Sequence, residues 1–292
     1  MTEALISPIA VTPVREGVLA YLRTDVYVGR CLELYGEHSP GEVRLFHALL
    51  NKGDAVVEAG AHVGDHTLAL AKIVGSEGKV VAFEPQEALA GLLLTNLAIN
   101  NVSGWTYVAP IALGDEAAKD DVFCPDTNYL APGNFGGISL NAVKHGKIVT
   151  LQSLDSFELP KLDFLKIDVE GMELALLRGA VNTIGMHRPV IYAENDRPEK
   201  SADLIRWLME ADYRLWWHLP RMIDRDNYKG KASIIYPNMV SINMLALPSK
   251  FHLSYFDIEE RDGNRMWPVA QIDDRPDAEY DRRLKTGVIK DA

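Results

Sequence analysis

From residue 54 onward the sequence alternates short apolar runs with stretches of helical period, and this alternation constrains the fold more than any other feature. Strands joined by helical crossovers are parallel, and the helices then pack on both faces of the sheet. Two later runs have no helical pattern between them, so we expect an antiparallel pair there. The crossover-linked strands are expected at 55–60, 79–85, 106–115, 162–170 and 188–196, and the last two at 213–220 and 238–248.

The same pattern divides the chain into three parts. Residues 51–248 are predicted to form an α/β domain with a seven-stranded, mostly parallel sheet and an antiparallel C-terminal strand. Residues 1–50 are predicted to form an N-terminal extension, in which a β-hairpin (VLAYL, then VYVGRCLEL) precedes a helix. Residues 249–292 are a charged C-terminal tail.

Composition excludes several classes of partner. The formal net charge of −11 repels phosphate backbones, so we expect no nucleic-acid partner. Cys31 and Cys124 form no disulfide framework and no CxxC motif, which favours a reducing compartment. No apolar run approaches the roughly 20 residues of a transmembrane segment, and the N-terminus lacks the pattern of a signal peptide. We therefore expect a cytoplasmic protein, and a homo-oligomer remains open.

The segment VVEAGAHVGDHT joins the first strand of the α/β domain to the next helix and has the features of a ligand site. Gly60 and Gly64 let a ligand approach the backbone, and the helix start directs amides at an anionic group. A dinucleotide site has a further glycine where His62 stands. The spacing of Glu58, Gly60 and Gly64 instead resembles the first motif of S-adenosylmethionine-dependent methyltransferases, with Ala61 and His62 in the turn. A nicotinamide dinucleotide site and a turn without a ligand are the alternatives.

Two further acids follow the next two strands. Glu84 ends the second strand, where a carboxylate can accept hydrogen bonds from both ribose hydroxyls of a nucleoside. The alternative is an acid that stabilises the N-terminus of the next helix. Asp115 ends the third strand, where it can hold an adenine amino group, or it is an ordinary turn aspartate.

The segment LKIDVEGMELALLRGA, with GDAVVEAGAHVGDHT, FEP, IALGD and NFGGISL, resembles the FkbM family of methyltransferases between Val18 and Pro248. The resemblance implies a Rossmann-like class I methyltransferase fold. It also implies transfer of a methyl group from S-adenosyl-L-methionine, most often to a hydroxyl group, with a small molecule or glycan as the substrate. The chain departs from the expected pattern at His62, where an asparagine would follow GA.

Ligands in such folds sit at the carboxyl ends of the strands, and a methyl acceptor there must lose its hydroxyl proton. A carboxylate base, a histidine base or a metal-bound oxygen can remove it. Asp168 is the first candidate for this catalytic role, followed by His218 and Glu194. Asp168, Glu194 and Asn195 also offer the oxygen ligands that suit Mg²⁺. The alternative is a polar cluster around Arg197, with loop-capping roles for the acids.

Three other histidines lie close to the expected site. His38, in the segment YGEHSP, is expected either in a lid over the site or in a plain connecting turn. His66, near a helix start, is interpreted as a packing or capping residue, and His62 lies in the cofactor turn.

Two other functions compete with methyl transfer. An NAD(P)-dependent oxidoreductase needs the missing glycine and a set of hydride-transfer residues that the sequence lacks. A non-catalytic binding module that keeps the fold is disfavoured by the intact residues Glu58, Gly60, Gly64 and Glu84.

Overall fold

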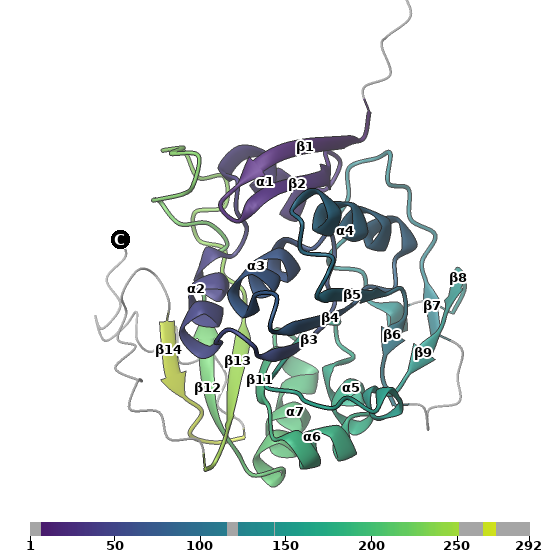
Figure 1. Cartoon of the computed structure of the whole chain (residues 1–292), viewed down its shortest axis with the longest axis vertical. Helices are drawn as coiled ribbons and strands as arrows, with labels where there is room; N and C mark the ends of the chain where they lie inside the picture. The colour runs from purple at the N-terminus through teal and green to yellow at the C-terminus, as the bar shows by residue number, and fades with distance from the viewer. Residues whose placement is uncertain (1–6, 116–121, 143, 251–264, 273–292) are drawn as a thin grey trace, which may run out of the picture.

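The structure is a computed structural model that describes residues 7–115, 122–142, 144–250 and 265–272. Its centre is one twisted sheet with helices on both faces (Figure 1). The helices α2, α3 and α4 cover one face, and α5, α6 and α7 cover the other. Their bounds are Pro40–Leu49, Asp65–Val74, Glu87–Ile99, Glu173–Arg178, Val181–His187 and Pro198–Glu210.

The sheet has the strand order β14-β12-β13-β11-β10-β3-β4-β5. All five predicted crossover-linked strands contribute a parallel strand, and β13 runs antiparallel to both β11 and β12. This arrangement confirms the predicted Rossmann-like class I methyltransferase fold. The strands are β3 Ala55–Ala59, β4 Lys79–Phe83, β5 Thr106–Ala109, β10 Phe164–Ile167, β11 Val190–Glu194, β12 Tyr213–Leu219 and β13 Asn243–Pro248.

Each central strand is buried on both faces, because successive side chains enter different apolar clusters. Val56 packs with the α2–α4 side and Val57 with the α5–α7 side. The chain order reverses between β3 and β10: the chain first builds outward through β4 and β5, then returns to place β10 beside β3. Such a switch point opens a crevice at the carboxyl ends of the two strands, where ligands bind.

The N-terminal extension is a hairpin followed by helices, but one of its predicted strands is wrong. The hairpin pairs β1, Ile9–Val14, with β2, Gly17–Leu22. The segment VYVGRCLEL, expected as a strand, instead contains the helix α1, Val28–Tyr35. Its buried residues fall on one helical stripe, namely Val28, Cys31, Leu32 and Tyr35. Burial of that stripe outweighs the strand preference of the valine and tyrosine side chains.

Asn96 of α4 and Asn100, the residue that follows this helix, attach the hairpin to the α/β domain. The Asn96 side chain, fully buried, accepts a hydrogen bond from the backbone amide of Ala20 and donates one to its carbonyl oxygen. Asn100 makes the same pair of bonds with Val18. These side-chain amides thus form the hydrogen bonds with the hairpin backbone that the backbone of a neighbouring strand would otherwise form.

The predicted strand at 106–115 is divided in the structure. β5 ends at Ala109, and Pro110, which lacks a backbone donor, follows it. β6, Ala112–Leu113, pairs with β9, Leu151–Gln152, outside the main sheet. The connection from 116 to 160 also contains β7, Val122–Cys124, paired with β8, Lys147–Val149, and two short 3₁₀ helices, Leu140–Ala142 and Leu154–Phe157.

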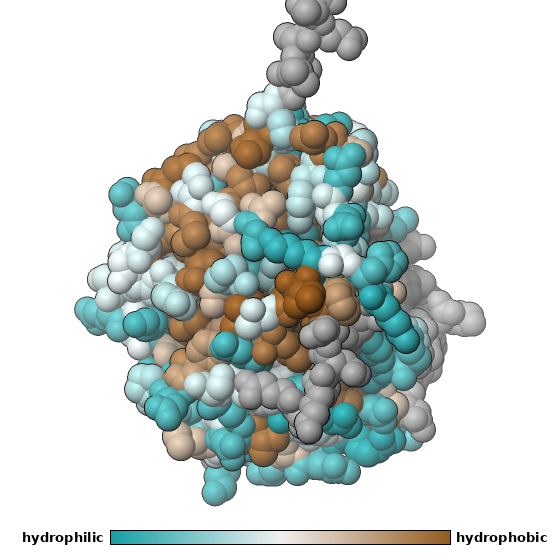
Figure 2. Space-filling view, turned by 90° about the vertical axis from the view of Figure 1, so that its right-hand side faces the viewer, coloured by the Kyte–Doolittle hydropathy of each residue, from teal (hydrophilic) through white to brown (hydrophobic). Residues whose placement is uncertain are grey.

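The segment predicted as a charged tail adds an eighth strand, β14, Arg265–Pro268, which pairs antiparallel with β12. The three-part division of the chain stays a prediction. Among the described residues, no helix combines the length and the apolar character needed to cross a bilayer. On the side shown in Figure 2, apolar patches lie among polar side chains, as on an ordinary protein surface.

Candidate functional site

A cavity of about 570 Å³ opens at the carboxyl ends of β3 and β10, a volume within the usual range of small-molecule sites. The strand ends form one part of its wall. The rest is formed by the turns before α1 and α2, the starts of α2 and α3, the segment 134–137 and the connection between β12 and β13. A smaller cavity of about 40 Å³, lined mostly by apolar residues, adjoins it. The two cavities share Gly60, Glu84, Gln86, Gly136, Asp168 and Glu170.

The turn after β3 requires glycine at two positions. Gly60 has a φ of 83°, and a Cβ atom there would lie 1.7 Å from the carbonyl oxygen of Asp168. Gly64 has a φ of 88°, and its Cβ would meet Leu93 at 2.3 Å. The turn therefore packs directly against the end of β10 on one side and against α4 on the other. Gly60 and Ala61 line the large cavity, whereas Gly64 lies behind it.

His62 also has a positive φ, of 50°, and its side chain reaches back to the N-terminal extension. Its Nε2 atom lies 3.2 Å from Oδ2 of Asp25, which is buried. Burial lowers the pKa of His62, but the Asp25 carboxylate outweighs this and raises it overall. The histidine that replaces the expected asparagine is thus held by a residue of the extension.

Glu58 is buried at the end of β3 and has partners within the protein. Its Oε2 accepts a hydrogen bond from the Thr67 hydroxyl at 2.5 Å, and its Oε1 lies 3.6 Å from Nζ of Lys166. Burial raises the pKa of Glu58 to about 7, although the Lys166 charge opposes the rise. Lys166 Nζ also lies 3.3 Å from Asp168, so one buried cation joins the ends of β3 and β10.

Lys166, whose side chain is only 2% exposed, was not among the predicted site residues. Its burial lowers its pKa, but attraction by Asp168 and Glu58 reverses this, so the lysine stays charged. The sequence feature that could have identified it is a single lysine inside the apolar run LDFLKI. A charged side chain is buried in a strand only when oppositely charged or hydrogen-bonding partners lie next to it.

Glu84 is 3% exposed and is fixed by the backbone on both sides. Its Oε2 accepts a hydrogen bond from the amide of His62, and its Oε1 accepts one from the amide of Gln86, both at 2.8 Å. Each carboxylate oxygen has a second lone pair, and the residue lines both cavities. Glu84 is therefore oriented to accept two further hydrogen bonds from a ligand.

Three carboxylates meet at the ends of β10 and β11. Asp168, Glu170 and Glu194 each bring one oxygen within 4.8 Å of the others. Arg197 forms ion pairs with Glu170 and Asp196, and its guanidinium lies 3.6 Å from Glu194. Burial and the neighbouring acids raise the pKa of Glu194 well above its ordinary value. Arg197 therefore supplies positive charge to this group of acids.

The structure does not bring Asn195 into this group, so the predicted Mg²⁺ ligand set is wrong at that position. The Asn195 side chain is buried and donates to Sδ of Met244 at 2.8 Å. Successive residues at a strand end point to opposite faces, so Glu194 faces the cavity and Asn195 does not.

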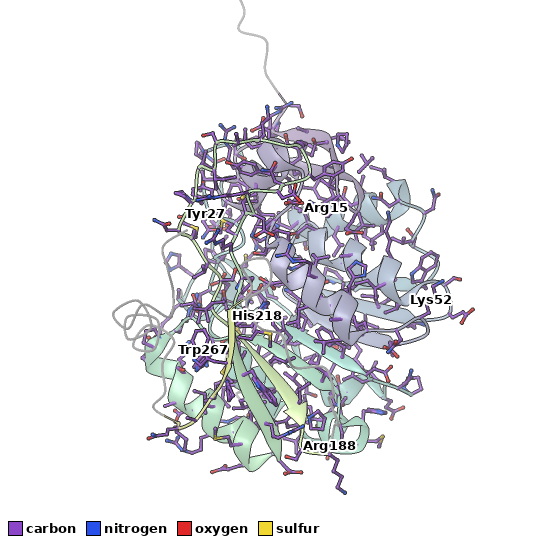
Figure 3. All side chains as sticks on the ribbon, turned by 90° about the vertical axis from the view of Figure 1, so that its left-hand side faces the viewer. Arg15, Tyr27, Lys52, Arg188, His218 and Trp267 are labelled. Carbon is purple, nitrogen blue, oxygen red and sulfur yellow. The ribbon has the colours of Figure 1, made fainter. Side chains whose placement is uncertain are left out.

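His218 and Asp115 also lie outside both cavities. His218 is fully buried on β12, where its Nδ1 lies 2.7 Å from the Tyr192 hydroxyl (Figure 3). It is not placed to take a proton from an acceptor, which corrects the prediction of a histidine base. Asp115 follows β6 and is half-buried.

A second group of polar side chains lines the large cavity on the side of α2 and α3. Nδ1 of His38 lies 3.0 Å from Oδ2 of Asp65, and the ring of His66 stacks on the ring of His38. Glu42, buried at the start of α2, lies in the same wall. His38 lies in the connecting turn before α2, and its side chain lines the cavity; its role as a lid stays a prediction. Asp65 was missed, although it stands in the quoted segment HVGDHT.

Known proteins match the chain over the same region. The family model for the methyltransferase FkbM domain matches residues 58–215. A curated relative, the hexuronic acid methyltransferase AglP of Haloferax volcanii, is 25% identical over 162 residues. The match covers 54% of this chain and 62% of AglP, so the chain spans less than two thirds of that relative.

Two solved structures are similar at low sequence identity. The methyltransferase FkbM of Methylobacillus flagellatus is 15% identical with a TM-score of 0.45, covering 70% of this chain and 50% of that chain. An S-adenosylmethionine-dependent O-methyltransferase of Thermotoga maritima is 13% identical with a TM-score of 0.44, covering 85% of this chain and 80% of that chain.

Proposed function

Because the chain belongs to the FkbM methyltransferase family, we propose that it transfers a methyl group from S-adenosyl-L-methionine to a hydroxyl group of a small molecule or glycan. The observation that carries this proposal is the pair of adjoining cavities at the switch point of the sheet. The smaller, of about 40 Å³, is lined mostly by apolar residues, and the larger mostly by polar and charged residues. Asp168 and Glu84 line both.

The residues around the small cavity fit the cofactor. Glu84 would hold the two ribose hydroxyls, because its carboxylate is already oriented by two backbone amides. Ile111, Leu113 and Met172 supply apolar walls for the adenine ring. Gly60 would admit the amino-acid end beside the backbone of the turn. When bound, S-adenosylmethionine supplies a methyl group activated by a positively charged sulfur.

Two of the strand-end acids have different proposed roles toward the acceptor. Asp168 lies where the two cavities meet and its side chain is 38% exposed, so a hydroxyl entering the large cavity can reach it. We propose that the Asp168 carboxylate takes the proton of the acceptor's hydroxyl group. The Lys166 ammonium, 3.3 Å away, stabilises the negative charge of Asp168. Burial and the neighbouring acids raise the pKa of Glu194 well above its ordinary value, which favours its protonated form. In that form it would donate a hydrogen bond to the acceptor rather than remove its proton.

A sugar or sugar-containing acceptor fits the wall of the large cavity best. Carboxylates and imidazoles line it, and such groups form hydrogen bonds with adjacent hydroxyls. The curated relative is itself a hexuronic acid methyltransferase, which supports a carbohydrate acceptor.

The proposed reaction is tested with S-adenosylmethionine that carries a labelled methyl group. The full chain is incubated with polar metabolite and glycan fractions, and the labelled products are treated with mild alkali. We expect label in a carbohydrate product that resists alkali, because an ether bond survives and a methyl ester does not. Label released by alkali would show transfer to a carboxylate and would contradict the hydroxyl assignment.

Glu84→Gln is expected to weaken the binding of S-adenosylhomocysteine, the demethylated product, by about 1–3 kcal/mol. The change keeps the side-chain volume but removes the charge that strengthens the ribose hydrogen bonds. Calorimetric titration of the purified protein measures the difference. Glu87→Gln is the matched control, because Glu87 is exposed three residues later and lines neither cavity. Equal affinities in the two variants would remove Glu84 from the cofactor site.

A further inference from the structure

The wall of the large cavity on the α2–α3 side brings together two imidazoles and a carboxylate. His38 comes from the turn before α2, and Asp65 and His66 are the first two residues of α3. One nitrogen or oxygen from each lies within 4.8 Å of those of the other two. All three line the cavity. They lie in a different part of the wall from the strand-end acids that Arg197 neutralises.

The spacing of these atoms suits neighbouring ligands of one ion. Nδ1 of His38 and Oδ2 of Asp65 are 3.0 Å apart. Two ligands about 2.1 Å from a tetrahedral Zn²⁺ are about 3.4 Å apart, so these two atoms need to separate by only about 0.4 Å to bind one ion. Imidazole nitrogen combined with carboxylate oxygen favours Zn²⁺ and related transition metals over Mg²⁺ or Ca²⁺, which prefer oxygen ligands alone.

His66 provides an independent observation. Its side chain lines the cavity but is 6% exposed, and among the described residues its Nε2 atom has no hydrogen-bond partner. The ring is held between His38, which stacks on it, and Phe46, which meets it edge-on. A buried imidazole nitrogen without a partner is unfavourable, and a bound ion satisfies it.

We propose that His38, Asp65 and His66 bind one divalent transition-metal ion, of which Zn²⁺ is the expected representative. Three protein ligands leave a fourth coordination position open. Because all three ligands line the large cavity, an oxygen of a cavity-bound molecule could supply the fourth ligand. The site is independent of the proposed methyl transfer, and its test needs no methyl acceptor.

The test measures metal binding to the full chain. The protein is treated with a chelator, dialysed and titrated with Zn²⁺ by calorimetry, and a parallel sample is titrated with Co²⁺ and followed by visible absorption. We expect one ion per chain and visible absorption bands from the Co²⁺ form. His38→Ala and Asp65→Asn should each lower Zn²⁺ affinity by more than tenfold, because loss of even a supporting partner reduces affinity by about 10–100-fold.

Two controls locate the ion. His47→Ala removes an exposed histidine of α2, the helix that follows His38, and should leave Zn²⁺ affinity unchanged. Glu194→Gln removes a strand-end acid and should also leave it unchanged. Because His66 is buried, its replacement can unfold the protein. The test therefore uses substitutions of His38 and Asp65, which are partly exposed. Thermal unfolding of each variant is recorded.

Three results overturn the proposal. They are the absence of stoichiometric Zn²⁺ binding, unchanged affinity in both His38→Ala and Asp65→Asn, or loss of binding in Glu194→Gln alone. S-adenosylhomocysteine is titrated into the same samples. Normal binding of that ligand without metal binding rejects only the metal site, and the reverse result rejects only the cofactor site.

Discussion

Gly60→Ala is expected to abolish S-adenosylhomocysteine binding and to destabilise the protein far more than Gly53→Ala. The two glycines have nearly the same backbone conformation, with φ values of 83° and 85°. In both variants the alanine must adopt a left-handed backbone conformation, which destabilises the folded protein by about 1–2 kcal/mol. Only at Gly60 does the new Cβ also meet a neighbour, the Asp168 carbonyl oxygen at 1.7 Å, whereas nothing lies within 4 Å at Gly53.

The overlap at Gly60 adds about 1–3 kcal/mol to the loss of stability, because backbone atoms on both sides must move apart. The movement separates the turn after β3 from the end of β10 and so distorts the cofactor site. Chemical denaturation measures the stability difference, and calorimetry measures the ligand affinity. If both alanine variants unfold alike and bind S-adenosylhomocysteine equally, the close approach of these two strand ends is not required.

Lys166→Met is expected to lower the free energy of unfolding by about 3–5 kcal/mol at about pH 8, since it leaves the buried Glu58 carboxylate without its cation. Lys161→Met is the matched control. Lys161 also pairs with two aspartates, but its side chain is 53% exposed, and such a pair contributes about 0–1 kcal/mol. Chemical denaturation of the two variants gives the comparison.

The effect of Lys166→Met should depend on pH. In the wild type, the pKa of Glu58 is raised from 4.5 to about 7, so its contribution to stability is full below about pH 4.5 and is lost as the pH rises through 7. Loss of the Lys166 charge raises this pKa further. The destabilisation should therefore be smaller at about pH 5, where Glu58 takes up a proton, than at about pH 8. Adding Glu58→Gln should remove most of that difference, and a pH-independent loss would contradict the assignment.

Much of the fold was predictable because burial of the central strands leaves a local signature. Runs such as AVVEA and DFLKI are apolar almost throughout, and glycine, proline or polar residues bound them. The N-terminal extension was harder to predict, since the segment that contains α1 has strand-forming residues. Its helix depends on packing against residues that are distant in sequence, including Tyr228 and Lys229 beside Gly36. A short segment cannot reveal such contacts.

The candidate site was predictable where position along a strand fixes the function. Gly60, Glu84 and Asp168 follow strand ends, and the structure places all three on the cavity wall. Position does not fix the direction of a side chain, so Asn195 and His218 were assigned to the site and point elsewhere.

Clusters that join distant segments were not predictable. Lys166 takes its partners from two strands, and the pairing of His38 with Asp65 depends on how α2 packs against α3. The turn that carries His38 lies outside the part of the chain matched by the family model. The extension thus contributes to the cavity a residue that the matched region of the family model does not include.

The most direct test of the account is binding of S-adenosylhomocysteine compared with NAD. Both are titrated by calorimetry into the full chain, and the midpoint of thermal unfolding is recorded with each. A ligand that binds only the folded protein stabilises it by about 2.7 kcal/mol at a concentration 100 times its Kd. We predict that S-adenosylhomocysteine binds with one molecule per chain and raises the midpoint, whereas NAD does neither. Binding of NAD without binding of S-adenosylhomocysteine would contradict the assignment of the site to a methyl donor.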